Sequence, residues 1–256
     1  MQDWTPREHY TAEDLVEIIR ILRDGENGCP WDKVQTHASI RKNFLEETCE
    51  ALEAIDADDP VMMQEELGDV LMQVVFHTVI EEERGRFDME KVCREVCEKL
   101  VFRHPNIFAS SAAENAGINS WDALKNKEKG RTTLADELDT VPATLPALMR
   151  AAKLQKRAAR GGGTGTTDPA ELETLARRVE AGDNAEAALG ELLFKTVALA
   201  RLAGLDPEQA LHSACEKFIK RFTAKEQSIL ASGRTLEELS REALLASWDA
   251  QKRNGR

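Results

Sequence analysis

The segment Phe44-Leu-Glu-Glu-Thr-Cys-Glu-Ala-Leu-Glu-Ala-Ile55 (FLEETCEALEAI) places four glutamates within twelve residues. Successive residues of an α-helix turn by about 100°, so the acidic and apolar side chains of this segment separate onto two sides. One side carries Glu46, Glu47, Glu50 and Glu53, and the other carries Leu45, Cys49, Leu52 and Ile55. The segment therefore predicts an amphipathic helix whose acidic side either faces solvent or forms part of a site.

The same spacing of apolar residues, three and four apart, recurs along most of the chain. It appears in residues 15–22, 61–80, 89–102, 186–202 and 207–222. Alternation with a period of two, which is typical of half-buried strands, is missing. We therefore predict an all-α protein.

Turn-forming residues divide the first half of the chain into four helices. The breaks fall at residues 25–30, at Asp58-Asp59-Pro60, at Gly85 and at Pro105, which disfavours helical geometry at His104. Short connections favour antiparallel neighbours, so these helices are expected to form a bundle.

A repeated pattern indicates a second helical unit. Residues 67–75 (LGDVLMQVV) recur as residues 189–197 (LGELLFKTV), and residues 98–103 (EKLVFR) recur as residues 216–221 (EKFIKR). The intervening segment contains Pro142 and Pro146 and ends in a flexible glycine-rich run. We therefore predict domains at 1–130 and 166–256, joined by a connector at 131–165.

Composition excludes several classes of protein. The net charge of -12 opposes a broad electrostatic grip on nucleic acid, and only 5% of residues are aromatic. No run approaches the roughly 20 apolar residues of a membrane span, and the N-terminal sequence MQDWTPREHY has no apolar signal segment. The five cysteines are sparse and odd in number, which favours buried thiols over a disulfide framework or zinc. We expect a cytoplasmic protein with no nucleic-acid or membrane partner.

A narrow polar stripe crosses the predicted helix at 61–80. From Val70 to Ile80 nearly every residue is apolar, yet Glu66, Asp69, Gln73 and His77 lie on one side. Buried polar groups without partners cost about 1 to 3 kcal/mol each. The stripe is therefore expected to face polar partners or trapped water.

The acidic helix at 44–55 supplies such partners. If the two helices pair across the Asp58-Asp59-Pro60 turn, Glu47 and Glu50 converge on Glu66 and Asp69. Like charges about 4 Å apart repel by roughly 4 kcal/mol at an effective dielectric constant of 20, so cations must be present or the carboxylates must protonate. Oxygen ligands without cysteine favour Mg²⁺ or Mn²⁺, and Mg²⁺ is commonly shared with substrate phosphates.

Two pairs of residues are candidates for phosphate and nucleotide binding. Lys99 and Arg103 lie one turn apart, and both side chains suit phosphate oxygens, although cations near a helix C-terminus are favourable in any case. Trp121 and Lys125 are also four apart, which allows one to cover a base while the other meets phosphate. Simple packing is the alternative for the tryptophan.

Taken together, these residues resemble the MazG-type nucleoside triphosphate pyrophosphohydrolases of the all-α NTP pyrophosphatase superfamily. The resemblance covers nearly the whole chain, and it is specific because the motifs occur in the family's order. They are Gly28-Cys-Pro-Trp-Asp32, Leu45-Glu-Glu47, Glu66-Leu-Gly-Asp69, Gln73-Val-Val-Phe-His77, Arg103-His-Pro-Asn-Ile-Phe108 and Trp121.

The resemblance implies Mg²⁺-dependent hydrolysis of NTPs and dNTPs to the monophosphate and pyrophosphate by tandem MazG units that dimerise through the bundle. It implies a catalytic set in which Glu47, Glu50, Glu66 and Asp69 hold metal, with Glu46 and Glu65 in supporting roles. It also implies that Lys99, Arg103 and Lys125 bind phosphates and that Trp121 lies near the nucleotide.

The second unit departs from this pattern. Ala187, Ala188 and Glu191 stand where the first unit has Glu65, Glu66 and Asp69, and Glu173 is followed by Ala176 instead of a second acid. We therefore expect the metal site in the first unit, although the C-terminal copy carries the activity in some relatives.

Other functions remain open from the sequence. A non-catalytic helical scaffold or nucleotide-sensing protein would leave the acidic residues merely solvated. Among enzymes, relatives specialised for dUTP or for phosphoribosyl-ATP are alternatives, because nothing in the sequence identifies the residues that read the base.

Overall fold

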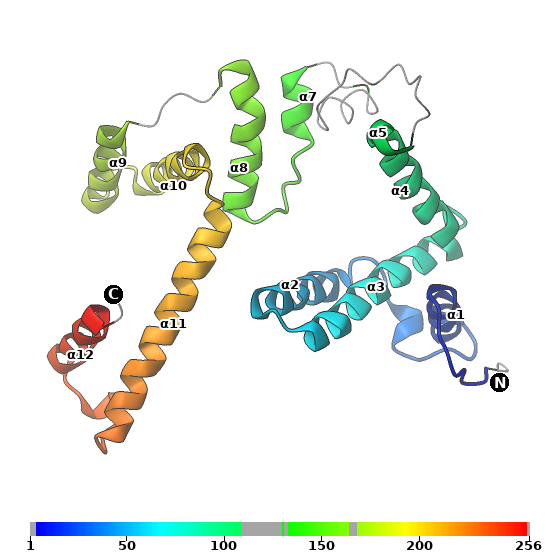
Figure 1. Ribbon diagram of the computed structural model, residues 1–256, viewed down its shortest axis with the longest axis horizontal. Helices are drawn as coiled ribbons and strands as arrows, with labels where there is room; N and C mark the ends of the chain where they lie inside the picture. Colours follow the sequence, from blue (N-terminus) through cyan, green and yellow to red (C-terminus); the bar gives the residue numbers. More distant parts are fainter. Residues whose placement is uncertain (1–3, 109–129, 131–132, 164–167, 255–256) are drawn as a thin grey trace. The chain divides into compact units, whose positions relative to one another are not determined.

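The computed structural model describes residues 4–108, 130, 133–163 and 168–254 (Figure 1). The chain divides into two compact units, Met1–Leu124 and Lys125–Arg256. Every regular element within the described ranges is a helix, which confirms the all-α prediction. None of the helices in this part of the chain is both long and apolar enough to span a bilayer.

The described helices of the first unit end at the turn residues that the sequence indicates. They are α1 (Ala12–Arg23), the 3₁₀ turn η1 (Asp32–Val34), α2 (Arg41–Ala57), α3 (Pro60–Glu83), α4 (Met89–Arg103) and α5 (Pro105–Phe108). The Asp59 side chain accepts hydrogen bonds from the first turn of α3, and Pro60 occupies its first position. Asp88 caps α4 in the same way, and α4 ends immediately before His104.

The core of the first unit lies between α1 and the C-terminal half of α3. Val16 and Ile19 of α1 pack with Val75, Val79 and neighbouring residues of α3. All of these side chains are at least nine-tenths buried, so this contact is the main apolar anchor of the unit.

The α2–α3 hairpin packs through small side chains. Ala51 and Ala54 are the buried residues of α2, and Asp58 adopts a left-handed conformation that turns the chain into α3. Small side chains let the two helix backbones approach closely, which brings the polar faces of α2 and α3 together.

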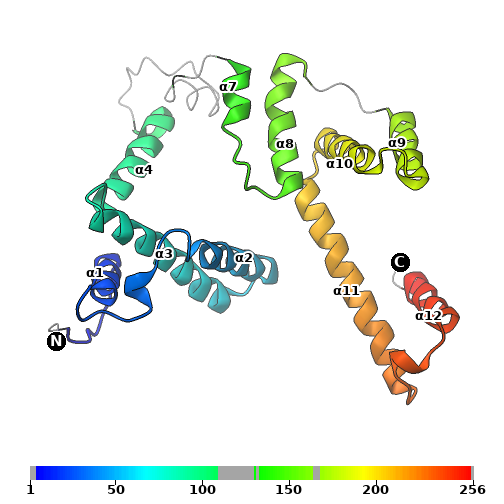
Figure 2. The ribbon, with the colours of Figure 1, turned by 180° about the vertical axis from the view of Figure 1, so that it is seen from behind.

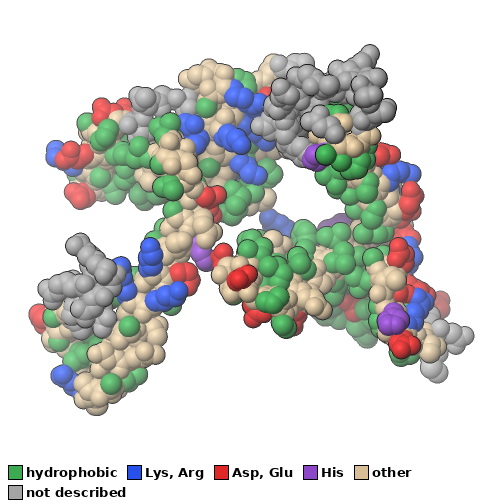
Figure 3. Space-filling model, in the orientation of Figure 1, with side chains coloured by type: hydrophobic (Ala, Val, Ile, Leu, Met, Phe, Trp, Pro, Cys, Tyr) green, Lys and Arg blue, Asp and Glu red, His purple; other side chains and the backbone are tan. Residues whose placement is uncertain are grey.

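Many larger apolar side chains of the first unit remain at its surface. They include Leu45, Leu52, Ile55, Leu67, Leu71, Leu100, Val101 and Phe102. Figure 3 shows hydrophobic side chains at the surface over α2 and α3, beside acidic ones. Cys49, Cys93, Cys97 and Cys215 are also exposed and unpaired, so the prediction of buried thiols is wrong for the single chain.

A tight loop connects α1 to the start of α2. A Cβ atom at Gly28 would lie 2.4 Å from the backbone oxygen of Asp24 and 2.5 Å from that of Leu22, so only glycine fits there. The buried Arg23 side chain donates to the backbone oxygens of Asp32 and Gln35 at 2.7 and 3.2 Å. These contacts hold the loop against α1 and fix the segment that precedes α2.

The second unit is also helical (Figure 2). Its elements are α7 (Leu134–Asp139), α8 (Ala147–Ala158), η2 (Ala159–Gly161), α9 (Pro169–Ala181), α10 (Ala185–Leu202), α11 (Pro207–Ala231), η3 (Leu236–Glu238) and α12 (Arg241–Asn254). The repeated segment 189–197 lies within α10, as its counterpart 67–75 lies within α3. Helices α9 and α10 pack closely, in the same chain order as α2 and α3.

Candidate active site

Three carboxylates from two helices meet at the α2–α3 hairpin. Glu47 of α2 and Glu66 and Asp69 of α3 each offer a carboxylate oxygen, and these oxygens lie within 4.8 Å of one another. All three residues are partly buried. The structure thus places three of the four predicted metal-binding residues at one point.

The other predicted acidic residues surround this group. Glu50 is exposed, but its charge acts on both Glu47 and Glu66. Glu65 also acts on Glu66 through its charge. Glu46 forms an ion pair with Lys42 at 2.8 Å on the exposed face of α2. Glu50 therefore lies at the edge of the group, while Glu46 is engaged outside it.

The crowding of negative charge changes the proton affinity of the group. Partial burial, followed by the charges of Asp69 and Glu50, raises the pKa of Glu47 above the ordinary value of 4.5. Partial burial, followed by the charge of Glu50, likewise raises the pKa of Glu66. Both shifts mean that the ionised cluster is electrostatically unfavourable without a cation.

The chemistry of the donors fits a hard divalent cation. The ligands are carboxylate oxygens only, and no other group of three or more histidine, cysteine or acidic residues with this geometry occurs among the described residues. Oxygen-only sets suit Mg²⁺, Mn²⁺ and Ca²⁺ in preference to zinc.

The predicted phosphate-binding residues do not lie on the α2–α3 hairpin. Lys99 is partly buried and Arg103 is 8% exposed, both near the C-terminal end of α4. Helix α4 begins beside the C-terminal end of α3, whereas the carboxylates of α3 lie in its first half (Figures 1 and 2). Both figures show α4 leading away from the α2–α3 hairpin, so its C-terminal end, with the two cations, lies apart from the carboxylates within one chain. Trp121 and Lys125 lie outside the described residues.

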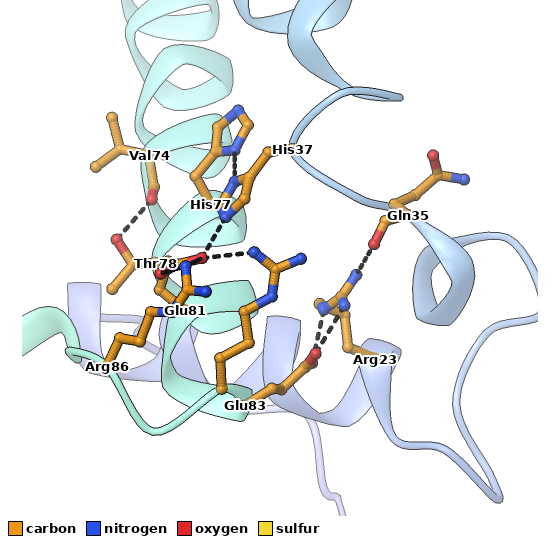
Figure 4. Close-up of polar contacts among 10 residues, drawn as sticks. Arg23, Gln35, His37, Val74, His77, Thr78, Glu81, Glu83 and Arg86 are labelled. Atoms are coloured by element: carbon orange, nitrogen blue, oxygen red, sulfur yellow. Dashed lines mark hydrogen bonds and ion pairs between the residues drawn. The ribbon is translucent and has the colours of Figure 1, made fainter.

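The polar stripe of α3 leads to a network that the sequence interpretation missed. His77 contacts His37 of the loop before α2, and His37 contacts Glu81 of α3 (Figure 4). Glu81 is 6% exposed and follows His77 by one turn, so extending the stripe by four residues would have identified it. No spacing rule points to His37, because it reaches the stripe from a loop.

Residues 35–108 match the model of the MazG nucleotide pyrophosphohydrolase domain. The nucleoside triphosphate pyrophosphohydrolase of Escherichia coli (strain K12) is 40% identical over 93% of this chain and 96% of its own length. The nucleoside triphosphate pyrophosphohydrolase/pyrophosphatase MazG of Thermotoga maritima is 40% identical, over 94% and 95%.

The chain belongs to the MazG nucleotide pyrophosphohydrolase family. The resemblance inferred from the sequence motifs is thereby confirmed. A nucleoside triphosphate pyrophosphohydrolase of Mycobacterium tuberculosis is a more distant relative, 30% identical over 87% of this chain and 61% of its own length. The matched MazG domain contains α2 to α5, and with them all the carboxylates of the candidate site and the His37–His77–Glu81 network.

The second unit of this MazG chain has a different arrangement at the corresponding hairpin. Lys195 of α10 donates to Glu171 of α9 at 2.8 Å, and the hydrogen bond to Glu171 together with the charges of Glu171 and Glu191 raises the pKa of Lys195. In the sequence repeat, Lys195 corresponds to Gln73 and Glu191 to Asp69. The ammonium group of Lys195 therefore offsets the charges of Glu171 and Glu191 in this hairpin.

Proposed function

We propose that this protein hydrolyses nucleoside triphosphates, with ribose or deoxyribose, to the monophosphate and pyrophosphate, and that its first unit is the catalytic one. The convergence of Glu47, Glu66 and Asp69 inside the segment that matches the MazG domain carries this proposal. The E. coli and T. maritima relatives, which align over nearly their full lengths, bear the same activity in their names.

Mg²⁺ is the proposed cofactor, with Mn²⁺ as a substitute. Glu47, Glu66 and Asp69 would hold it, with Glu50 completing the set from the edge of the group. When bound, such a cation neutralises charge on phosphate oxygens and acts as a Lewis acid in their hydrolysis. The raised pKa values of Glu47 and Glu66 support this assignment, because burial and neighbouring negative charge disfavour the ionised carboxylates and a cation would offset both effects.

The protein's own contribution to the chemistry is a proton acceptor beside the anhydride. Hydrolysis forms a bond from the oxygen of water to one phosphorus of the α–β anhydride and breaks the bond from that phosphorus to the bridging oxygen. The bridging oxygen leaves with the other phosphate, and the proton of the water must be accepted. A glutamate carboxylate of this acidic group that does not hold the metal would accept it.

A second copy of the chain is the proposed partner. The apolar residues of α2, α3 and α4 at the surface, such as Leu52, Leu67 and Leu100, form the type of surface that self-association buries. We propose that a homodimer covers this surface and that α4 of one copy brings Lys99 and Arg103 toward the carboxylates of the other.

The proposed compartment is the cytoplasm. All five cysteines are unpaired thiols, a state that a reducing compartment maintains.

The function is tested by measuring pyrophosphate release from each NTP and dNTP, with Mg²⁺ and with EDTA. The proposal predicts turnover that requires the metal. A non-catalytic scaffold predicts no turnover with any nucleotide and no effect of Mg²⁺ on the melting temperature. Comparison of the rates with dUTP and with phosphoribosyl-ATP distinguishes a broad enzyme from a specialised one.

The dimer is tested by complementation. Glu50→Gln and Arg103→Ala should each be inactive alone, because each removes part of every site. Co-expression of the two variants should restore part of the activity if one copy supplies Glu50 and the other supplies Arg103. Absence of restored activity in mixed dimers would show that both residues act within one chain.

A further inference from the structure

The polar stripe of α3 continues beyond the carboxylates. Gln73, His77 and Glu81 follow Asp69 at intervals of one turn and have no role in the proposed metal site. At 1.5 Å per residue, Asp69 and His77 are separated by about 12 Å along the helix axis. Long side chains on a helix lean toward its N-terminus, so His77 leans toward the carboxylates.

A chain of short hydrogen bonds fixes the His77 ring. The Nδ1 atoms of His37 and His77 lie 2.7 Å apart, and Nε2 of His37 lies 2.7 Å from Oε1 of Glu81. The two rings stack, with centroids 5.0 Å apart and planes 13° apart. Figure 4 shows the His77 ring on the Val74 side of His37, with Glu81 on the other side.

Glu81 is held as a carboxylate. Besides His37, it accepts hydrogen bonds from Arg84 at 2.7 Å and from Arg86 at 3.1 Å. The hydrogen bond from His37, followed by those from the two arginines, lowers the pKa of Glu81 to about 2. An ionised carboxylate only accepts hydrogen bonds, so Nε2 of His37 must carry a proton.

This proton determines which nitrogen of His77 is free. In a neutral His37 ring with a proton on Nε2, the Nδ1 atom is an acceptor, and the proton between the two rings therefore belongs to Nδ1 of His77. Burial lowers the pKa of His77, which favours the neutral form of that ring. Nε2 of His77 consequently carries a lone pair, and no hydrogen bond to it is found among the described residues.

A second acceptor lies between His77 and the carboxylates. Gln73 is 6% exposed, and its Oε1 atom is buried without a hydrogen-bond partner among the described residues. A buried acceptor left unpaired costs about 1 to 3 kcal/mol, which a bound donor would recover. The ring of Phe44 packs edge to face against the ring of His77, with centroids 5.6 Å apart.

We propose that Gln73 and His77 bind the nucleoside part of the substrate, and that His37 and Glu81 are positioning residues that hold Nε2 of His77 as a hydrogen-bond acceptor. This inference depends on the proposed function, because a triphosphate at the carboxylates leaves the nucleoside to lie along the α3 stripe. The ligand groups that match two uncharged acceptors are the amino, imino or hydroxyl donors of a base or sugar.

The kinetic test separates binding from chemistry. His77→Asn keeps a polar group at the position of Nδ1 but lacks one at Nε2, whereas His77→Gln keeps one near Nε2. Loss of one hydrogen bond should raise KM about tenfold in His77→Asn with little change in kcat, and less in His77→Gln. Glu81→Gln should also raise KM, and Glu81→Asp should restore part of the affinity. The exposed Glu90, paired with Arg94, provides the control Glu90→Gln, which should behave as the parent.

A spectroscopic test addresses the positioning residues without substrate. The ¹⁵N chemical shifts of the histidine rings should show His77 protonated on Nδ1 in the parent, with that preference lost in Glu81→Gln after circular dichroism has confirmed folding. A parent protonated on Nε2, or an unchanged KM in an active His77→Asn enzyme, would overturn the inference. A parent that hydrolyses no nucleotide would instead refute the proposed function, and the nucleoside site with it.

Discussion

Glu47 on α2 and Asp69 on α3 bring carboxylate oxygens to within 4.8 Å of each other across a helical hairpin, although both side chains are acidic. The hairpin enforces this approach through the left-handed turn at Asp58 and the small side chains Ala51 and Ala54. Packing elsewhere in the unit therefore holds the carboxylates together against their mutual repulsion. This arrangement is suited to binding a cation.

Neutralising one carboxylate should stabilise the metal-free protein while it abolishes activity. In EDTA, Asp69→Asn and Glu66→Gln remove like-charge repulsion, so the melting temperature should rise by a few degrees. With Mg²⁺ the same variants should lose at least about 100-fold in pyrophosphate release, because they remove a metal ligand. Calorimetry and the pyrophosphate assay measure the two effects.

The control for this prediction lies in the second unit. Glu191 occupies the position of Asp69 in the repeat but lies near the ammonium group of Lys195. Glu191→Gln removes an attraction, so it should not raise the melting temperature and should leave turnover intact. A similar gain in stability from Glu191→Gln and Asp69→Asn would contradict the electrostatic account of the first unit.

The stabilising effect of Glu66→Gln should depend on pH. The pKa of Glu66 is raised on folding, so its favourable contribution is present below the ordinary value of 4.5 and is lost as the pH rises through the folded-state value. In EDTA, the difference in melting temperature between Glu66→Gln and the parent should therefore be largest near pH 7 and vanish below about pH 4.5. A difference in melting temperature that grows as the pH falls would contradict a raised pKa of Glu66.

Glu81 should show the opposite dependence on pH. Its pKa is lowered to about 2, so its contribution to stability is present above 4.5 and is lost as the pH falls toward 2. The difference in melting temperature between the parent and Glu81→Gln should decrease over that range. A difference that stays constant from pH 5 to pH 2 would show that Glu81 is not ionised in the fold.

Much of the fold follows from apolar spacing and turn residues. Pro60 and Asp59 predict the start of α3, and Pro105 predicts the end of α4, because these effects act within one turn of helix. The carboxylate cluster was also predictable, since a short turn leaves the acidic faces of α2 and α3 few ways to pair. The exposure of apolar residues such as Leu52 was not predictable, because helical spacing marks an apolar face without showing whether another part of the chain covers it.

The network at His77 was only partly predictable from the spacing of residues in the sequence. Glu81 shares the helical period of His77, but His37 is placed by the loop that Gly28 and Arg23 hold against α1. A loop position depends on contacts that carry no regular spacing. A histidine brought in by such a loop is visible only once the tertiary structure is known.

Gly28→Ala should disrupt the loop that carries His37. The new Cβ would meet backbone oxygens at 2.4 and 2.5 Å, which side-chain rearrangement cannot relieve, so stability should fall by about 1 to 3 kcal/mol. KM should rise as well, because His37 moves. Gly190→Ala is the control, since its Cβ would meet nothing within 4 Å inside α10 and should stabilise the protein by about 0.5 to 1 kcal/mol.

The second unit should not respond to Mg²⁺. Lys195 already offsets the charges of Glu171 and Glu191 in the α9–α10 hairpin. Hydrogen exchange should therefore show protection by Mg²⁺ in α2 and α3 and none in α9 and α10. Protection confined to α9 and α10 would show that the second unit binds the metal, which would contradict the prediction.

Location of the metal tests the central claim most directly. A crystal of the protein soaked in Mn²⁺ should give an anomalous difference peak bounded by Glu47, Glu66 and Asp69, and the peak should be absent from Asp69→Asn crystals. A fully ordered α2–α3 hairpin with no peak between these carboxylates, or a peak only at the second unit, would contradict the account.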